Sequence, residues 1–284
     1  MARDRGSGVI GIGIISFDRP QYLGQLLESL EQQVDAPPMA WHLFQDGAVN
    51  KFSERVVGDQ GRIQEAIRAF LTARLPGVKE AHVRRTNVGI GINQFEAYEF
   101  MCNRYEQIVV LEDDVVLSPY WARLLPALFD GLEVRPDTFG FTTGFRRRCE
   151  RETINDHLDR VSPGRPHWWM IGFTPDRWAR IRPHYLRYYE MIQECDYGHL
   201  PHSKIMALFE EVGHTHHASS QDGGKDMAVH CAGMHRAQLT VNRGIGIGRE
   251  GLHFNPGLFE RMGFHDQEPY VFESDKTRGG FEWV

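Results

Sequence analysis

Three consecutive carboxylates, Glu112, Asp113 and Asp114, directly follow the apolar run 108–111. Because like charges this close repel one another, such a triplet favours a bound cation. Mg²⁺ and Mn²⁺ take carboxylate and phosphate oxygens together, so the triplet predicts a divalent metal held beside a phosphate group. The alternative is a solvated loop or a helix N-terminus, where negative charge is also stabilised.

A second feature is an excess of arginine between positions 135 and 187. This stretch has eleven arginines and six acidic residues, a local charge of +5 in a chain of net charge −6. Aromatic residues are interleaved with the arginines, a mixture that suits a phosphate-bearing or stacked ligand. Arg146, Arg147 and Arg148 are consecutive and cannot share one helix face, so a loop is expected there. The alternative is a solvated helix face with salt bridges.

The elements that must position these residues alternate between buried-strand patterns and amphipathic segments. Alternation of this kind predicts an α/β fold, a parallel sheet with helices on both faces. Ligands of such sheets bind beyond the carboxyl ends of the strands. The predicted strands are 9–15, 41–45, 81–84 and 108–111, and the predicted helices are 20–30, 60–74 and 93–104.

Composition excludes several classes of protein. The 284 residues are 41% hydrophobic and 25% charged, which is ordinary for a globular domain. No apolar run approaches the ~20 residues of a membrane span, and residues 1–8 do not resemble a signal peptide. The four cysteines are scattered, which predicts reduced thiols in a cytoplasmic protein. The glycines of 244–248 do not follow the dinucleotide-binding fingerprint.

Four motifs, in this order and spacing, resemble the nucleotide-sugar half of GT-A glycosyltransferases, among them N-acetylglucosaminyltransferase I and bacterial family 2 enzymes. Asp18 departs from the pattern, because relatives usually have asparagine there. A further likeness returns near 226–253. The four motifs are 14–30 (IISFDRPQYLGQLLESL), 45–47 (QDG), 87–94 (NVGIGINQ) and 110–120 (VLEDDVVLSPY).

The resemblance implies a GT-A type fold, with a Rossmann-like, mostly parallel sheet flanked by helices and an acceptor-binding C-terminal half. The nucleotide-sugar half would be 1–117 and the acceptor-binding, catalytic half 118–284, within one continuous domain. Donor-binding residues would be Arg19, Asp46, Asn93 and Asp113, and metal ligands Asp114 and His253.

The second half must also supply the base that deprotonates the acceptor. In relatives an aspartate that opens a helix has this role, which implies Asp226, with Asp196 in reserve. The departure is Lys225, where relatives commonly have tryptophan. Residues 214–224 are expected to form an exposed polar loop that could close over the donor. Further candidates for the base are His230, His235, His253 and Asp222.

The function implied is a Mn²⁺- or Mg²⁺-dependent glycosyltransferase. It would transfer a hexosyl or N-acetylhexosaminyl group from a nucleoside-diphosphate sugar, UDP most of all, to a hydroxyl of an anionic acceptor with inversion. The acceptor could be a lipid-linked or anionic glycan, or DNA with a hydroxymethylated base, as in phages. Other classes are a nucleotidyltransferase, which lacks support because no glycine-rich basic loop follows the first strand, and a non-catalytic binding module. Acceptor-binding residues would be Arg146, Arg147, Arg148, Trp168 and Trp169.

Overall fold

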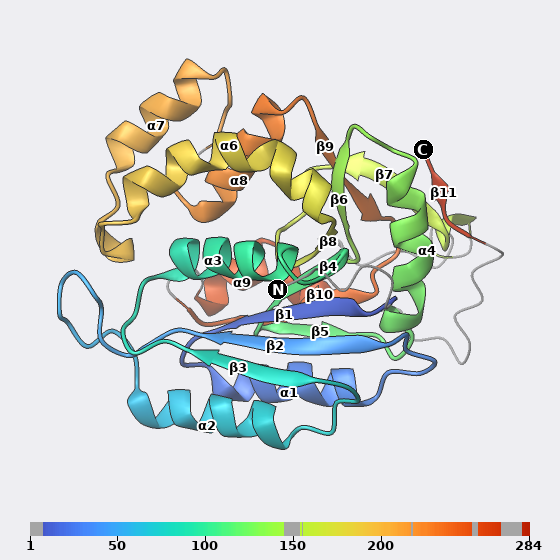
Figure 1. Ribbon diagram of the computed structural model, residues 1–284, viewed down its shortest axis with the longest axis horizontal. Helices are drawn as coiled ribbons and strands as arrows, with labels where there is room; N and C mark the ends of the chain where they lie inside the picture. The colour runs from blue at the N-terminus through green and yellow to red at the C-terminus, as the bar shows by residue number, and fades with distance from the viewer. Residues whose placement is uncertain (1–7, 145–153, 155, 217, 252–254, 268–279) are drawn as a thin grey trace.

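The computed structural model describes the chain except residues 1–7, 145–153, 155, 217, 252–254 and 268–279. The described residues form a twisted sheet of nine strands in the order β11-β7-β9-β6-β8-β4-β1-β2-β3 (Figure 1). Its strands are β1 Ile10–Ser16, β2 Met39–Gln45, β3 Lys79–Val83, β4 Gln107–Glu112, β6 Thr138–Thr142, β7 Arg160–Gly164, β8 Met170–Phe173, β9 His235–Leu239 and β11 Glu282–Trp283.

Strands β4, β1, β2 and β3 are mutually parallel, and β8 runs antiparallel between β4 and β6. Strand β9 is parallel to β6, and β7 is antiparallel to β9. A separate antiparallel ribbon pairs β5, Val115–Leu117, with β10, Gly244–Gly246. Within the described residues the sheet is therefore mostly parallel, and the predicted α/β fold class is confirmed.

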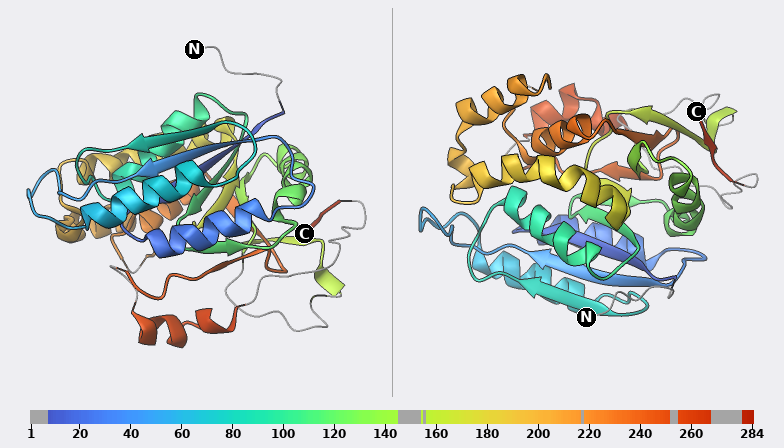
Figure 2. Two further views of the ribbon diagram at one scale, coloured as in Figure 1. Left: turned by 90° about the horizontal axis from the view of Figure 1, so that it is seen from below. Right: turned by 45° about the horizontal axis from the view of Figure 1, so that its top comes forward.

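Helices cover both faces of the sheet, and each layer has its own apolar core. In the view from below, α1 and α2 lie in front of the strands, while α3 and α6 lie behind them (Figure 2). No described helix is both long enough and apolar enough to cross a membrane. The helices are α1 Pro20–Glu31, α2 Gln60–Thr72, α3 Ile90–Cys102, α4 Trp121–Glu133, α6 Pro175–Ile192, α7 His202–Glu211, α8 Gln221–Cys231 and α9 Pro256–Arg261, with 3₁₀ turns η1 Tyr197–His199 and η2 Phe264–Asp266.

The sequence of β1 explains how α3 reaches the sheet. Its isoleucines at 10, 12 and 14 point to the core under α1, because side chains alternate along a strand. Gly11 then faces α3, and a Cβ there would collide with the ring of Tyr105. The alternation of isoleucine and glycine therefore lets one face of β1 pack closely while the other buries branched side chains.

The seven elements predicted up to residue 112 are confirmed within a few residues at each end. One expectation beyond them is wrong. Residues 221–224 are the first turn of α8 rather than part of a loop, and Ser220 is its N-cap. Glycines occur there because α8 packs against α6 so closely that a Cβ at Gly224 would meet the ring of Tyr188.

Candidate active site

Polar side chains meet at the carboxyl ends of β1 and β4, which are neighbours in the sheet. Strand β4 ends at Glu112, and Asp113 and Asp114 form the turn into β5. Strand β1 ends at Ser16, and Arg19 is the residue before α1. The topology therefore brings the basic end of one strand to the acidic end of the next, at the edge where α/β sheets bind ligands.

The guanidinium of Arg19 bridges the two aspartates of this acidic turn. Nη2 donates to Asp113 Oδ1 at 2.5 Å, and Nη1 donates to Asp114 Oδ2 at 2.8 Å. The backbone N–H of Phe17 donates to the second oxygen of Asp113 at 3.3 Å. Burial raises the pKa of Asp113, and the charge of Arg19 opposes that shift. One fixed cation thus partly neutralises two carboxylates.

A divalent ion fits Asp114 better than Asp113. The side chain of Asp113 is 1% exposed and both its oxygens accept hydrogen bonds, whereas that of Asp114 is 15% exposed. No described residue donates to Asp114 Oδ1, so this oxygen could bind a divalent cation. The predicted second ligand, His253, lies outside the described residues.

The alternating glycines of 244–248 have a packing role beside the acidic turn. Ile247 donates its backbone N–H to the Asp114 carbonyl at 2.7 Å. A Cβ at Gly248 would collide with the Asp114 carboxylate, and one at Gly246 would collide with the ring of Trp169. The glycines therefore let this segment lie directly against the candidate metal ligand.

Asp46, at the end of β2, is held by four donors. One oxygen accepts from the backbone N–H groups of Gly47 and Val88, at 2.9 and 3.0 Å. The other accepts from Asn87 Nδ2 and the backbone N–H of Gly89, at 2.9 and 3.0 Å. Burial raises the pKa of Asp46 to about 6, although the N–H groups oppose the shift. Asp46 shapes the loop before α3, and its contact with a nucleotide stays a prediction.

Asn93, in the first turn of α3, also makes contacts within the protein. Its Nδ2 donates to the carbonyl of Phe44 at 3.0 Å, and its Oδ1 accepts from Arg84 Nε at 2.9 Å. The side chain is buried. It therefore fastens α3 to β2, and a role in donor binding stays a prediction.

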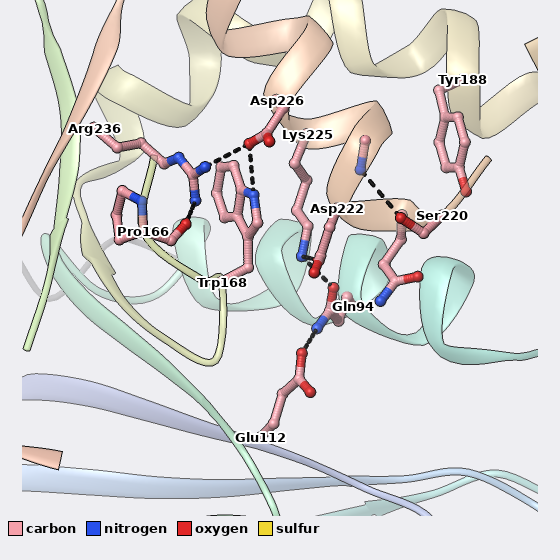
Figure 3. Close-up of polar contacts among 12 residues, drawn as sticks. Gln94, Glu112, Pro166, Trp168, Tyr188, Ser220, Asp222, Lys225, Asp226 and Arg236 are labelled. Carbon is pink, nitrogen blue, oxygen red and sulfur yellow. Dashed lines mark hydrogen bonds and ion pairs between the residues drawn. The ribbon is translucent and has the colours of Figure 1, made fainter. Parts of the chain in front are cut away.

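Asp226 lies inside α8 rather than opening the helix, so the helix-opening position inferred from relatives is wrong for this chain. Its Oδ1 accepts from Trp168 Nε1 at 2.9 Å and from Arg236 Nη2 at 2.6 Å (Figure 3). The Arg236 guanidinium also lies 4.2 Å from the centre of the Trp168 ring. Both donors use the same oxygen, so among the described residues Oδ2 accepts nothing. The side chain is 19% exposed, and such an oriented carboxylate can accept a proton from a hydroxyl.

Contacts on both sides of Asp226 lead to the acidic turn. Trp169 follows the tryptophan that donates to Asp226, and its backbone carbonyl accepts the backbone N–H of Glu112 at 2.9 Å. Lys225, next to Asp226 in α8, donates to Gln94 Oε1 at 2.7 Å, and Gln94 Nε2 donates to Glu112 Oε1 at 3.0 Å (Figure 3). The structure therefore brings the predicted base and the predicted metal motif into one network.

Sequence reasoning missed Gln94 and Arg236, and it treated Lys225 only as a departure from relatives. Lys225 is 1% exposed and its Nζ pairs with Asp222 Oδ1 at 2.9 Å. Asp222, a candidate base in the sequence, is thus the counter-ion of Lys225. The only signal that could have identified this network was a lysine where a tryptophan is expected, because a buried cation needs a buried acceptor.

Asp196, the reserve base, lies apart from this network. It is the N-cap of η1, and its carboxylate accepts the backbone N–H of Gly198 at 2.9 Å. A hydrogen bond from the hydroxyl of Ser53 lowers its pKa. None of its described contacts is with Asp226, so the geometry favours Asp226 of the two.

Of the predicted acceptor-binding residues, the structure describes Trp168 and Trp169. Trp168 is buried at 2% exposure and orients Asp226 instead. Trp169 is half-buried, with its ring stacked 4.1 Å from that of His167. Arg146, Arg147 and Arg148 lie outside the described residues.

Arginines of α6 support the alternative of a helix face with salt bridges. Arg182 pairs with Glu99 at 2.9 Å, and Arg187 pairs with Glu211 at 2.8 Å. Arg177 is buried and donates to the carbonyl of Pro136 at 2.8 Å. These three arginines therefore all have partners within the protein, as in the alternative of a helix face with salt bridges.

No protein-family profile and no curated protein matches the sequence. Among solved structures, matches include the galactosyltransferase LgtC in complex with donor and acceptor sugar analogues, at 14% identity and a TM-score of 0.41, over 75% of this chain and 68% of that one. A mannosyltransferase from Pyrobaculum calidifontis in complex with GDP-Man and Mn²⁺ matches at 12% identity and a TM-score of 0.41, over 61% of this chain and 46% of that one. S. aureus TarS matches at 17% identity and a TM-score of 0.29, over 54% of this chain and 20% of that one. At TM-scores this low, these likenesses assign neither a fold nor a function to the chain.

Proposed function

We propose that this protein is a GT-A type glycosyltransferase that uses a nucleoside-diphosphate sugar, UDP-linked most of all. The observation that carries the proposal is the convergence of Asp226 and the acidic turn through the pair Trp168-Trp169. The indole N–H of Trp168 donates to Asp226, and the backbone carbonyl of Trp169 accepts the backbone N–H of Glu112. Glycosyl transfer needs a base that deprotonates the acceptor and a cation that stabilises the leaving diphosphate. The proposed base and the proposed cation-binding turn lie on either side of this tryptophan pair.

The donor would lie with its diphosphate between Arg19 and Asp114. Arginine binds phosphate oxygens in bidentate fashion, so Arg19 would turn part of its guanidinium from the aspartates to the donor. A divalent ion held by Asp114, Mn²⁺ or Mg²⁺, would stabilise the negative charge that develops on the leaving diphosphate. Asp113, fixed by Arg19 and Phe17, would lie near the ribose or the donor sugar.

Asp226 would take the proton of the acceptor hydroxyl at Oδ2. As that proton leaves, the acceptor oxygen forms its bond to the anomeric carbon, and the bond from that carbon to the diphosphate oxygen breaks. Attack opposite the leaving group inverts the anomeric configuration. Trp168 and Arg236 would hold the carboxylate in place, because both donate to the oxygen that does not accept the proton.

The acceptor half, 118–284, would bind an anionic glycan, and the arginines at 146–148 would provide the charge. DNA with a hydroxymethylated base is the other acceptor considered, since its phosphates offer the same charge. The described arginines of α6 contribute little to either, because they pair within the protein. The acceptor proposal therefore depends on the consecutive arginines. The proposed location of the protein is the cytoplasm.

The decisive experiment is a thermal-shift screen of nucleotide sugars with Mn²⁺, followed by a turnover assay with the sugar that binds. A donor present at 100 times its Kd should stabilise the protein by about 2.7 kcal/mol. The Asp226→Asn variant should bind that donor equally well and, with acceptor present, release nucleoside diphosphate at least ~100-fold more slowly. A protein that binds no nucleotide sugar, or an Asp226→Asn variant with unchanged turnover, would contradict the proposal.

A further inference from the structure

A cluster of two histidines and a glutamate lies on strands β2 and β3, away from the acidic turn. In the parallel pair, His42 is directly opposite Glu80, and His82 follows two residues later on β3. Side chains two apart on a strand point to the same face, so the pairing register itself brings the three together. His42 is the central residue of β2, and its ring contacts Phe100 and Tyr105 on the α3 side of the sheet.

The ligand-type atoms of this cluster are as close as those around a single small cation. His42 Nδ1 is 3.1 Å from His82 Nε2 and 3.6 Å from Glu80 Oε2. Two atoms bound to one tetrahedral zinc ion at ~2.0–2.1 Å are about 3.3 Å apart. Among the described residues, this is the one group of three histidine, cysteine or acidic side chains whose ligand atoms come within 4.8 Å of one another.

The surroundings suit ligation by neutral imidazoles. Burial lowers the pKa of His42 to about 4 and also lowers that of His82, so both rings are uncharged at neutral pH. A neutral imidazole has one ring nitrogen with a free lone pair, which is the atom that binds a metal. The Tyr105 hydroxyl lies 2.6 Å from His42 Nε2, and a proton on Nε2 directed at it leaves Nδ1 to bind a metal. Arg104 pairs with Glu80 Oε2 at 2.9 Å, and this oxygen has a second lone pair for the ion, while Oε1 lies 3.8 Å from His82 Nδ1.

Access and position also fit a metal site. Glu80 and His82 are partly exposed, at 44% and 24%, whereas His42 is buried at 1%. An ion could therefore enter from solvent and become fixed against a rigid, buried ligand. Strand β3 is the edge strand of the sheet, and the ion would join it to β2.

We propose that His42, Glu80 and His82 form a zinc site that is separate from the acidic turn and fastens the edge strand β3 to β2. Three protein ligands leave the fourth tetrahedral position for water. Imidazole nitrogens with one carboxylate favour Zn²⁺ over Mg²⁺, which takes oxygen ligands. The site does not depend on the proposed transferase activity.

Zinc affinity of the 284-residue chain tests this proposal. The protein is first stripped with EDTA and desalted, and Zn²⁺ is then titrated in competition with a chromophoric chelator. His82→Gln and Glu80→Gln should each lower zinc affinity at least ~10-fold, since even loss of an outer-sphere partner costs that much. Both positions are partly exposed, so both variants should fold, as circular dichroism can verify.

Two matched variants separate this site from other zinc ligands. His199→Gln removes an exposed histidine whose carboxylate neighbour is Asp196, and Asp114→Asn removes the candidate ligand of the acidic turn. Zinc binding at the β2–β3 site should survive in both. An affinity that His82→Gln leaves unchanged, or no zinc binding by the stripped protein, would show that the two histidines are only a hydrogen-bonded pair.

Discussion

Lys225 Nζ donates to Gln94 Oε1 at 2.7 Å, although 131 residues separate the two along the chain. The contact joins α8, which carries Asp226, to α3, which packs on the sheet beside the acidic turn. Lys225 is buried and its charge is balanced by Asp222 at 2.9 Å. Lys225 therefore connects the helix of the proposed base to the helix that packs beside the proposed donor site.

Lys225→Met should destabilise the fold by about 3 kcal/mol, because it leaves Asp222 without its counter-ion. Urea unfolding followed by fluorescence measures this loss. The double variant Lys225→Met/Asp222→Asn should be more stable than the sum of the single changes predicts, by at least ~1 kcal/mol. Strictly additive losses would show that the two side chains do not depend on each other.

Asp226→Asn should lower kcat at least ~100-fold and leave the donor Kd nearly unchanged, because the amide cannot take the acceptor proton. Trp168→Phe should lower kcat roughly 10-fold, since it removes one of the two donors that orient the carboxylate. The matched control is Trp178→Phe, which removes an indole N–H that donates to Glu99 instead. Equal losses of kcat in the two tryptophan variants would argue against orientation by Trp168.

Asp114→Asn should lower kcat/KM at least ~100-fold with Mn²⁺ present, because the amide is a poorer ligand for a hard cation. Asp266→Asn, a change at a surface aspartate, is the control and should have no effect. Titration with EDTA and re-addition of Mn²⁺ gives the second measurement. Full turnover in excess EDTA would remove the metal from the proposal.

Asp46 predicts a pH dependence of stability. Its pKa is about 6 in the folded chain, above the ordinary 3.8, so between pH ~4 and ~6 the folded chain binds more protons than the unfolded chain. The free energy of unfolding should therefore fall by about 2 kcal/mol as the pH rises through this range. The difference in stability between the wild type and Asp46→Asn should shrink accordingly. A difference that grows with pH would mean that the four N–H donors outweigh burial.

Serine at positions 146, 147 and 148 should raise the acceptor KM and leave the donor KM unchanged. Attraction between exposed charges is screened within ~8 Å at 0.15 M salt, so the acceptor KM of the wild type should rise with salt and that of the variant much less. With DNA as acceptor, the slope of log affinity against log salt counts the phosphates neutralised. Full activity on a small neutral sugar would show that these arginines are solvated surface residues that do not bind the acceptor.

The first half of the fold could be predicted because its signals are local. Alternating isoleucine and glycine in β1 and the apolar run before Glu112 each specify a strand without help from distant residues. The second half could not, since β9 lies between β6 and β7, and this order is set by contacts far apart in sequence. The start of helix α8 was predicted wrongly because Gly223 and Gly224 favour a loop locally. In the structure Gly224 is needed for close packing on Tyr188, and Gly223 for close packing on His216 and Phe209.

The candidate site could also be predicted only in part. The resemblance implied Arg19, Asp113 and Asp114, and the structure brings them together at neighbouring strand ends, while their roles stay predictions. The partners of Asp226 and of the neighbouring Lys225 come from three separate segments, so no spacing in the sequence points to Arg236 or Gln94. Asp46 and Asn93 were found at the expected strand and helix ends, but their hydrogen bonds to the protein depend on side-chain geometry that motifs do not encode.

The position of β8 between β4 and β6 affects the chain while it is being synthesised. Strands β1 to β4 can pair once residue 112 has left the ribosome, but one edge of β4 waits for β8, about 60 residues later. At 5–20 residues per second, the apolar strand 107–112 has an open edge for roughly 3–12 s. Charged residues beside such a strand discourage its pairing with other chains. The three carboxylates 112–114 end that strand, so their negative charge would discourage such pairing while the edge is open.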